Sequence, residues 1–533
     1  MRLLSKTLSA LILVLGLTHG ASGQERGSVR DFDLIRSTSP WMSSRNAAGL
    51  GSMPVERIAV AEGSFEKDNG GLTDNAGSEN CFKAGAMTES YLKISDRLAF
   101  HGKLSYSFFR GKDMGGSILM DPSYNPINFY ESVDTTRGVK NRELYHLEGG
   151  LAYSLGKKWS IGVNVNYESG DQAKLKDPRF LNTWMDLGIS AGTRFAASEG
   201  FSIGLSLEYE RTLEALKSKT FGTTDKKYYT FTDYGGFYGT RELLDDNNGM
   251  VSIGTTNPMF NMFYGASVQI ETGRKTKTFH ELTYLRRSGY FGHPGSTKIM
   301  YTEHSGNILE YSGFATIRKG SDLHRIGLDL RYEGLFNYEN VYRFNTEAGE
   351  QSTVEYISQN EVLDRTDIYA GLSYTGYIGL KDFRPSWEYG AQASAFNTAS
   401  LATIYPFYRS SSSTAIDAQL YGKKNMLSGK NLFSVMVEAE FLTGFGNPKT
   451  DGILASSSSD APRSFDLYLN RDFEYKTATR VGGGLTFRYT RLFSDRIGGY
   501  IQLSDRYISL LHAAEYLKGR NRNTLELTIG CTF

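Results

Sequence analysis

The chain has 533 residues, a formal net charge of +1 and 40% apolar residues, and it is rich in Gly, Tyr and Phe but has only two cysteines. The near-zero net charge gives no support for binding to nucleic acid or an anionic polymer. Beyond the N-terminus no stretch approaches the roughly 18 continuous apolar residues of a transmembrane helix, and no linker or change of composition divides the chain into domains.

The N-terminus has the pattern of a secretory signal peptide. Arg2 and Lys6 precede an apolar run from Leu8 to Leu17, and the small residues Ala21-Ser22-Gly23 follow. We expect cleavage after Gly23, so residues 1–23 would be a signal peptide and the mature chain would be exported. No cysteine stands at the cleavage point to accept a lipid anchor.

The mature chain begins with an irregular segment, residues 24–55, that does not alternate as a strand does. Two interpretations are open: a plug inside a barrel, or a periplasmic tail that becomes ordered only near Trp41. The segment is far shorter than a separate plug domain and has no carboxylate-rich energy-coupling box, so active transport of the TonB-dependent kind is not expected.

A period of two recurs along residues 56–533. In the segment from Trp159 to Tyr167 the odd-numbered residues are apolar or aromatic and the even-numbered ones are small or polar. The same alternation returns at 201–209, 325–332, 433–441 and 525–533. This pattern predicts strands with one apolar and one polar face.

Aromatic residues begin and end the apolar face of the segments 159–167 and 201–209. At about 3.3 Å per residue and a tilt near 40°, their separation spans roughly 20 Å, which is close to the apolar band of an outer-membrane barrel.

Short polar reversals alternate with much longer connections. The reversals are Ser95-Asp96-Arg97, Gly156-Lys157-Lys158, Ser198-Glu199-Gly200, Thr272-Gly273-Arg274, Lys319-Gly320-Ser321, Leu380-Lys381-Asp382, Ser428-Gly429-Lys430 and Ser494-Asp495-Arg496, and the long connections lie near 110–140, 216–258, 335–362 and 444–472. Short periplasmic turns and long extracellular loops are typical of outer-membrane barrels.

With a first strand near Arg57 to Phe65 and a last one near Asn523 to Phe533, the hairpins predict an all-β fold. We expect a single closed antiparallel transmembrane barrel over residues 56–533, with about 18 strands and with 16 as the alternative. An even number lets the last strand pair with the first, so that no hydrogen-bonding edge faces lipid.

Two further stretches carry a resemblance. The last strand, Leu525 to Phe533, ends in a carboxyl-terminal Phe533 that is similar to the signal recognised by the outer-membrane barrel-assembly machinery. Ser39-Pro40-Trp41-Met42 and Asn46-Ala47-Ala48-Gly49-Leu50, with the hairpin layout, resemble an uncharacterised family of Bacteroidetes outer-membrane barrels over nearly the whole mature chain. The latter segment is also faintly similar to the Asn-Pro-Ala-Gly-Leu motif of long-chain fatty-acid transporter barrels, with Ala47 in place of the proline.

This resemblance implies a barrel in the outer membrane of a Gram-negative bacterium, and it implies no established activity. The expected partners are outer-membrane lipid and the assembly machinery, together with either a small solute or a surface protein.

The alternation also predicts which charged side chains face the lumen. They are Asp186, Arg194, Glu208, Asp329, Arg331, Glu333, Glu438 and Glu440. Because both signs are present, the lumen should be polar and ion-paired, without a selectivity filter of a single sign. It is either a substrate-lined channel or a lumen braced by charges and blocked by loops.

The loop from Phe221 to Tyr238 concentrates aromatic residues among Thr, Asp and Gly. They are Tyr228, Tyr229, Phe231, Tyr234, Phe237 and Tyr238. They could form an adaptable contact surface for sugars, peptides or partner proteins. The favoured alternative is that strands extend beyond the membrane here and that the aromatic side chains pack within one hairpin.

No catalytic, cofactor or metal site is expected. His304 and Ser305 are residue types that a barrel hydrolase would use at the end of an outer loop, but adjacent residues of an extended chain point in opposite directions. No His or Cys pair has metal-ligand spacing. Cys81 and Cys531 should lie at opposite ends of the barrel and remain unpaired.

Three functional classes stay open, in this order of preference. The first is a channel or passive transporter for an unidentified solute. The second is a non-conducting accessory barrel of a surface complex or secretion apparatus, and the least favoured is a barrel hydrolase.

Overall fold

The computed structural model describes residues 31–533 except 123, 133, 223–225, 246–248, 347–350 and 495–496. The predicted signal peptide, residues 24–30 of the irregular segment and most of the predicted reversal at Ser494-Asp495-Arg496 therefore lie outside the described residues.

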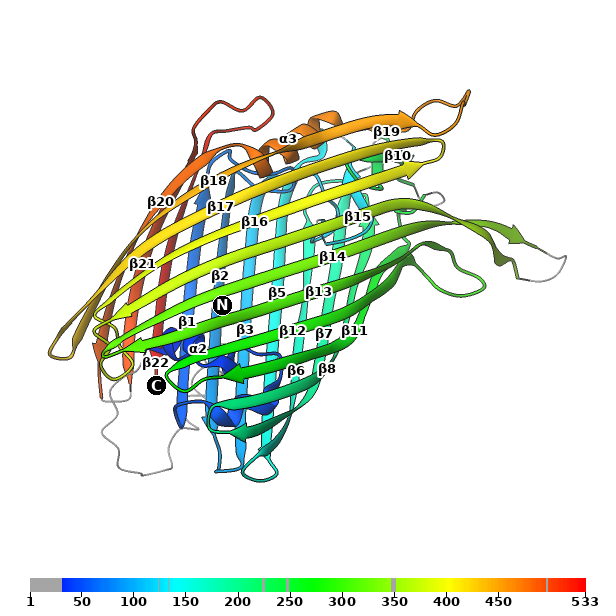
Figure 1. Cartoon of the computed structure of the whole chain (residues 1–533). Coiled ribbons are helices and arrows are strands. Elements are labelled where there is room, and N and C mark those ends of the chain that lie inside the picture. Colours follow the sequence, from blue (N-terminus) through cyan, green and yellow to red (C-terminus); the bar gives the residue numbers. More distant parts are fainter. Residues whose placement is uncertain are drawn as a thin grey trace.

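Eighteen strands form one antiparallel barrel, which confirms the predicted fold and the preferred strand count (Figure 1). The strands are β1 (Arg57–Asn69), β2 (Asn80–Lys93), β3 (Leu98–Met114), β5 (Gly138–Ser154), β6 (Trp159–Lys174), β7 (Arg179–Ser198), β8 (Phe201–Lys219), β11 (Thr256–Thr272), β12 (Thr276–Gly292), β13 (Met300–Lys319), β14 (Asp322–Asn345), β15 (Thr353–Ile378), β16 (Trp387–Ile404), β17 (Phe407–Ser428), β18 (Asn431–Ile453), β20 (Arg480–Leu492), β21 (Gly498–Leu510) and β22 (Asn521–Thr532).

The barrel closes between its first and last strands. β1 pairs with β2 along one edge and with β22 along the other. Beyond the end of β22, Phe533 N donates to Ala59 O at 3.0 Å, and Ala59 N donates to Phe533 O at 2.7 Å. The carboxyl terminus therefore supplies the last two hydrogen bonds of the seam, as a closed sheet requires.

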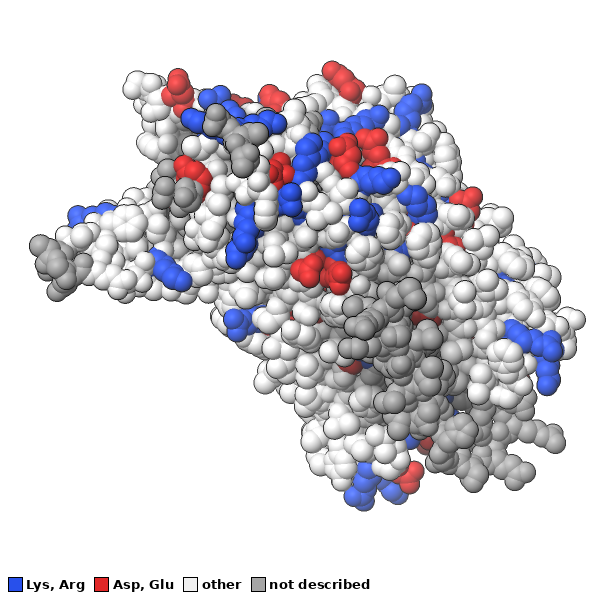
Figure 2. All heavy atoms as spheres, turned by 180° about the vertical axis from the view of Figure 1, so that it is seen from behind, with Lys and Arg blue, Asp and Glu red and all other residues white. Residues whose placement is uncertain are grey.

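The outer surface of the barrel is apolar because the predicted alternation holds. Along β6, Ile161 and Val163 are 45% and 47% exposed, whereas Gly162 between them faces the interior. Along β22, Leu525, Leu527 and Ile529 are likewise exposed. Figure 2 shows charged side chains gathered mainly toward the end with the long loops, and a broad area of the wall below them carries almost none.

The short and long connections gather at opposite ends, which we call the turn end and the loop end. The turns between β13 and β14 and between β17 and β18 contain Gly320 at φ 62° and Gly429 at φ 60°, a backbone conformation that a residue with a Cβ rarely adopts. The two cysteines are unpaired, as predicted.

Strands extend into two of the predicted long connections, and one of them is mostly strand, which corrects the sequence interpretation. β14 continues to Asn345 and β15 begins at Thr353, so 335–362 is mainly a paired ribbon that projects past the barrel wall (Figure 1). The interval 444–472 likewise begins with the end of β18. Both stretches leave the apolar belt, and a strand with water on both faces needs no apolar alternation.

A cap covers the loop end. It consists of a second, four-stranded sheet in the order β19 (Arg463–Ser464), β10 (Tyr238–Leu243), β9 (Tyr229–Asp233) and β4 (Asn128–Glu131), with the helix α3 (Asp466–Thr477) and a short 3-10 turn, η3 (Asp134–Thr136). Phe129 of β4 is fully buried and lies 4.7 Å, centroid to centroid, from Phe291 of the wall. The cap thus has an apolar core shared with the barrel.

A second filling element lies inside the turn end, and we call it the inner segment, residues 31–55. It contains α2 (Phe32–Thr38) and the 3-10 helices η1 (Pro40–Met42) and η2 (Ala47–Ser52). Asp31 caps α2, since its carboxylate accepts from Leu34 N at 3.0 Å. Phe32 and Ile35 are buried against wall residues, and each such burial stabilises the contact by about 1.5–3 kcal/mol.

We predict that deletion of Phe533 lowers the fraction of folded barrel. The seam would lose two backbone hydrogen bonds, each worth about 1 kcal/mol in water and more in lipid. The measurement is the heat-modifiable migration of the refolded protein on a cold gel. Phe533→Tyr keeps the backbone and the ring and should fold normally; equal folding of the deletion variant would contradict the seam argument.

Candidate functional site

The inner segment is held to the barrel wall by side-chain hydrogen bonds. Trp41 Nε1 donates to the Glu271 carboxylate of β11 at 2.7 Å, and Ser44 Oγ donates to the Glu281 carboxylate of β12 at 2.6 Å. Arg45 forms an ion pair with Glu310 of β13. These contacts place the segment against the inner faces of β11 to β13.

Asn46 is the most highly connected residue of the inner segment, and it is fully buried. Its Nδ2 donates to Gln269 Oε1 at 2.9 Å, to Thr193 O at 3.0 Å and to Leu205 O at 3.3 Å. Its Oδ1 accepts from Ala48 N at 3.0 Å and caps η2. One side chain thereby joins η2 to three strands, β7, β8 and β11.

Three glycines of the wall make room for this docking. A Cβ at Gly162 would lie 2.2 Å from Ala48 N, one at Gly192 would lie 2.4 Å from Asn46 Oδ1, and one at Gly204 would lie 2.6 Å from Gln269 Oε1. All three distances are shorter than van der Waals contact. The inner faces of β6, β7 and β8 therefore form a groove shaped to receive residues 46–48.

At the loop end, side chains of the wall bind carbonyl groups of the segment between β3 and β4, which folds into the barrel. Lys140 Nζ donates to Ser117 O at 2.7 Å and Asn182 Nδ2 donates to Ile118 O at 3.0 Å. Arg287 Nη2 donates to Tyr124 O at 2.8 Å. The cap is thereby fastened to β5, β7 and β12.

Arg287 is fully buried in the wall of the lumen. Its Nη1 donates to Glu333 at 2.7 Å and its Nη2 to Asn261 Oδ1 at 2.9 Å. Its guanidinium also lies 4.6 Å from the Tyr124 ring centroid. Removing Glu333 would leave an uncompensated buried charge. The ion pair thus fixes the guanidinium within the wall, where it bonds the Tyr124 carbonyl and contacts the Tyr124 ring.

The eight charged residues predicted for the lumen all lie on inward faces. Asp186 and Asp329 are on β7 and β14, and Asp329 accepts from Ser312 at 2.6 Å. Arg194 lies 3.4 Å from Glu271 and over the Trp41 ring, and Glu208 accepts from Ser206 and Ser267. Arg331 lies 2.6 Å from Glu333, and Glu438 and Glu440 line one small cavity. Arg194, Arg331 and Glu333 therefore form ion pairs, and Arg194 also lies against the inner segment at Trp41.

The six aromatic residues predicted as a loop contact mostly pack inside the cap. Phe231, Tyr234, Phe237 and Tyr238 are buried, and Tyr228 and Tyr229 are half-buried. Phe231 stacks on Phe465 at a centroid distance of 4.2 Å. The structure thus shows the packing alternative, although the aromatic residues pack across the cap, with Phe465 beyond their own hairpin.

His304 and Ser305 are not at a loop end but within β13. His304 is buried with its Nε2 2.8 Å from Asn261 Oδ1, and Ser305 is on the opposite, outward face. The described part of the chain has no group of three His, Cys, Asp or Glu residues placed to hold a metal ion. Within the same residues no helix is long and apolar enough to cross a membrane.

Three cavities follow one another along the wall that the inner segment leaves uncovered. We call the inner faces of β16, β17, β18, β20 and β21 the open wall. The turn-end cavity has a volume of 490 Å³, the middle cavity 140 Å³ and the loop-end cavity 720 Å³. Along β17 the lining residues run in order from Lys423 and Asn425, through Gln419 and Tyr421, to Ser411 and Ser413.

The neighbouring strand β18 repeats this order. Ser434 lines the turn-end cavity, Glu438 and Glu440 the middle one and Pro448 the loop-end one. The strand β20 pairs with β18 on its other side. A Cβ at Gly482 would lie 2.5 Å from the Glu440 carboxylate, and one at Gly484 would lie 2.4 Å from the Glu438 carboxylate. Small residues on β20 therefore leave the space that the two carboxylates occupy.

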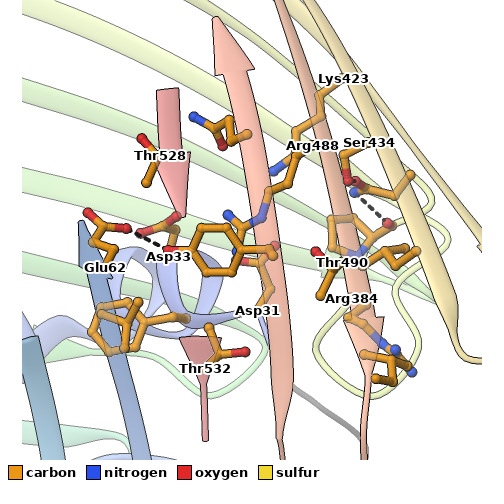
Figure 3. A pocket seen from close by; sticks show the side chains of 18 of the residues that line it. Asp31, Asp33, Glu62, Arg384, Lys423, Ser434, Arg488, Thr490, Thr528 and Thr532 are labelled. Carbon is orange, nitrogen blue, oxygen red and sulfur yellow. Dashed lines mark hydrogen bonds between the residues drawn. The ribbon is translucent and has the colours of Figure 1, made fainter. Parts of the chain in front are cut away.

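The turn-end cavity separates α2 from the open wall (Figure 3). Asp31 and Asp33 face it from α2 and its cap, and Lys423 and Arg488 face it from β17 and β20. Burial, together with repulsion from Asp31, raises the pKa of Asp33. The cavity is thus lined by charges of both signs.

Sequence patterns alone did not single out Asn46, Gln269, Arg287 or the three wall glycines. Asn46 carries a sequence signal only as part of the Asn-Ala-Ala-Gly-Leu stretch, on which the family resemblance partly rests. Inward glycines interrupt the polar face of a strand in many barrels, so their alignment under the inner segment becomes visible only when the strands are in register.

The fold defines a closed antiparallel β-barrel whose lumen is partly filled from both ends. A model of a family of unknown function, DUF6850, matches residues 47–533, and the chain belongs to this family. This agrees with the expected resemblance to an uncharacterised family. A comparison with curated proteins finds no match.

Three solved structures illustrate the similarity of the fold. The outer membrane transporter YddB from Escherichia coli has a TM-score of 0.41 at 7% identity, over 90% of this chain and 81% of that one. The FrpB iron transporter from Neisseria meningitidis scores 0.39 at 8% identity, over 92% and 84%. The ferric preacinetobactin receptor BauA from Acinetobacter baumannii scores 0.37 at 9% identity, over 90% and 80%. At these values the matches carry no functional argument.

We predict that Gly192→Val displaces the inner segment. The new side chain would overlap Asn46, and such overpacking costs about 1–3 kcal/mol. Hydrogen exchange of residues 46–52 should accelerate while the barrel remains folded. Gly188→Val is the matched control on the same inward face, because its Cβ would lie 3.6 Å from Asn166, an ordinary contact. Unchanged exchange in Gly192→Val would contradict the docking described above.

A second prediction concerns Asp233 of the cap. Burial raises the pKa of its carboxyl to about 7, and repulsion from Asp472 adds to this, against the lowering effect of the Gly235 and Tyr238 amides. The folded cap therefore binds a proton that the unfolded carboxyl releases near its usual pKa of about 3.9. The stability of the cap should be greatest at low pH and fall as the pH rises through 7.

Hydrogen exchange of residues 228–243 between pH 5 and pH 8, corrected for intrinsic rates, measures this effect. Asp233→Asn keeps an oxygen acceptor for the two amides but cannot ionise, so its exchange protection should not vary over that interval. A pH dependence as steep in Asp233→Asn as in the natural protein would show that another group is responsible.

Proposed function

We propose that the protein is a β-barrel of the outer membrane of a Gram-negative bacterium that lets a small solute pass along the open wall. The observation that carries this proposal is the succession of three cavities along β17 and β18 from the turn end to the loop end. A channel needs a polar route through an apolar surrounding, and the open wall offers one.

The membrane location rests on the physical chemistry of the outer surface. A closed sheet leaves no unpaired backbone edge, and its outward residues on β6 and β22 are apolar. Delivery to the membrane would use the predicted signal peptide, residues 1–23, and Phe533 as the signal for the barrel-assembly machinery. The bacterial phylum stays a prediction.

In this function the inner segment would narrow the lumen from one side. Its hydrogen bonds go mainly to β7, β8 and β11 to β13, so it covers one side of the lumen and leaves the opposite side lined by cavities. The middle cavity, with Glu438, Glu440 and Arg506, is the smallest of the three in line. We therefore place the narrowest point of the route there.

A non-conducting accessory barrel is the second candidate. The packed cap and the projecting ribbon of β14 and β15 favour it, because a barrel that serves a surface complex needs exposed contact area more than an open lumen. We propose no catalytic role for this protein.

We predict that a cysteine at Gln419 makes the conductance sensitive to a charged thiol reagent. Both natural cysteines are first replaced by serine, and single-channel currents are then recorded in planar bilayers before and after addition of a sulfonated methanethiosulfonate. Gln419→Cys should show a stepwise loss of current because its side chain lines the middle cavity. Ile416→Cys is the control, since Ile416 is 39% exposed on the outward face of the same strand and lines none of the three cavities.

The remaining outcomes separate the two candidates. Steady current that the reagent leaves unchanged in Gln419→Cys would place the route elsewhere in the lumen. No current from the intact protein, but current from a variant lacking residues 24–54, would support the inner segment as a plug. No current from either protein would favour the accessory barrel.

A further inference from the structure

An aromatic ring faces the lumen in the loop-end cavity. Phe396 of β16 pairs in register with Tyr369 and Ala415. Its chain neighbour Ala395 pairs with Ile416, whose side chain faces outward. Because successive residues of a strand face opposite sides, Phe396 points inward. Its side chain is 40% exposed and lines the cavity. A large apolar group presented to water inside a polar lumen contributes little to folding, which suggests that it meets a ligand.

Hydroxyl groups surround this ring on the same inward face. Thr398 and Ser400 follow it along β16, and Ser411 and Ser413 stand on β17. Ser400 and Ser411 hydroxyls lie 2.8 Å apart, and Thr398 donates to Asp367 at 2.6 Å. A hydroxyl both donates and accepts hydrogen bonds, so this wall suits a ligand whose own groups do the same.

The charged side chains of the cavity are largely occupied by one another. Arg365 lies 2.9 Å from Asp367. Arg331 lies 2.6 Å from Glu333, and Lys476 lies 2.7 Å from Asp472. Of the other charged groups that line the cavity, Asp74 and Asp233 each accept a hydrogen bond from a backbone amide, and Arg142 donates to Gln172. With most of its charged groups already bonded within the protein, the cavity fits a neutral ligand better than an ion.

We propose that the loop-end cavity binds a neutral oligosaccharide, with one sugar ring packed on Phe396 and its hydroxyls bonded to the Thr and Ser side chains. The C–H face of a pyranose is apolar and packs on an aromatic ring, while its edge carries hydroxyls. The volume of 720 Å³ falls within the range of about 300–1,000 Å³ that small-molecule sites occupy. This inference rests on the proposed function and names the solute class of that route.

The cavity is also lined by apolar side chains, among them Met120, Ile127 and Leu469, but the groups beside Phe396 on β16 and β17 are hydroxyls. A fatty acyl chain packed on Phe396 could not hydrogen-bond these hydroxyls, whereas a sugar can. A charged solute would have to compete with the ion pairs of Arg331 and Arg365. The neutral sugar is therefore the class that this lining favours.

Binding is tested directly on the detergent-purified full chain, by calorimetric titration with neutral hexasaccharides of gluco, manno and galacto configuration. We expect at least one of them to bind. Phe396→Ala should weaken its affinity by about tenfold, and Phe396→Trp should keep it, because the effect depends on an aromatic face. Phe441→Ala is the matched control, since Phe441 is also 40% exposed but points outward from β18.

The inference is overturned if none of the three hexasaccharides binds, or if Phe396→Ala binds as tightly as the natural protein. Two other probes are titrated in the same way: a heparin hexasaccharide, which is polyanionic, and palmitate, which has an acyl chain. Preferential binding of either one would overturn the inference as well. Titration needs no conductance, so sugar binding by a barrel that carries no current would refute the channel and leave this site standing. Current without sugar binding would do the reverse.

Discussion

The structure depends on the hydrogen-bonded closure of one sheet. Every strand edge in the barrel has a partner, including the seam where β1 meets β22 and Phe533 bonds Ala59. In a lipid environment an unpaired edge would leave several backbone groups unsatisfied at a cost of several kcal/mol each. Closure therefore explains why the chain forms an even number of strands and why its last residue takes part in the fold.

Closure of so many strands creates a second constraint, because the lumen becomes too wide for side chains to fill. Two segments that are not part of the wall occupy it instead. The inner segment enters from the turn end and bonds through Asn46, and the segment before β4 enters from the loop end and bonds to Arg287. In both cases buried polar side chains satisfy the backbone or amide groups of an irregular segment.

The two fillings are asymmetric, and this asymmetry is the basis for the functional proposal. Glycines on β6, β7 and β8 admit the inner segment on one side of the lumen, whereas the inner faces of β16 to β21 carry hydroxyls, small residues and cavities. Phe396 stands out on that side as an apolar ring among hydroxyls. The route and the solute class proposed for it both follow from which wall was left uncovered.

The class of fold follows from the amino-acid sequence alone, because a strand with lipid on one side and water on the other must alternate apolar and polar residues. That alternation located β6, β8, β14, β18 and β22 and the inward charges such as Glu333 and Glu440. It misjudged 335–362, where the strands leave the apolar belt and the alternation fades. The roles of Asn46, Gly192, Arg287 and Phe396 become visible only in the folded barrel, because each depends on a register or a contact between residues far apart in the chain.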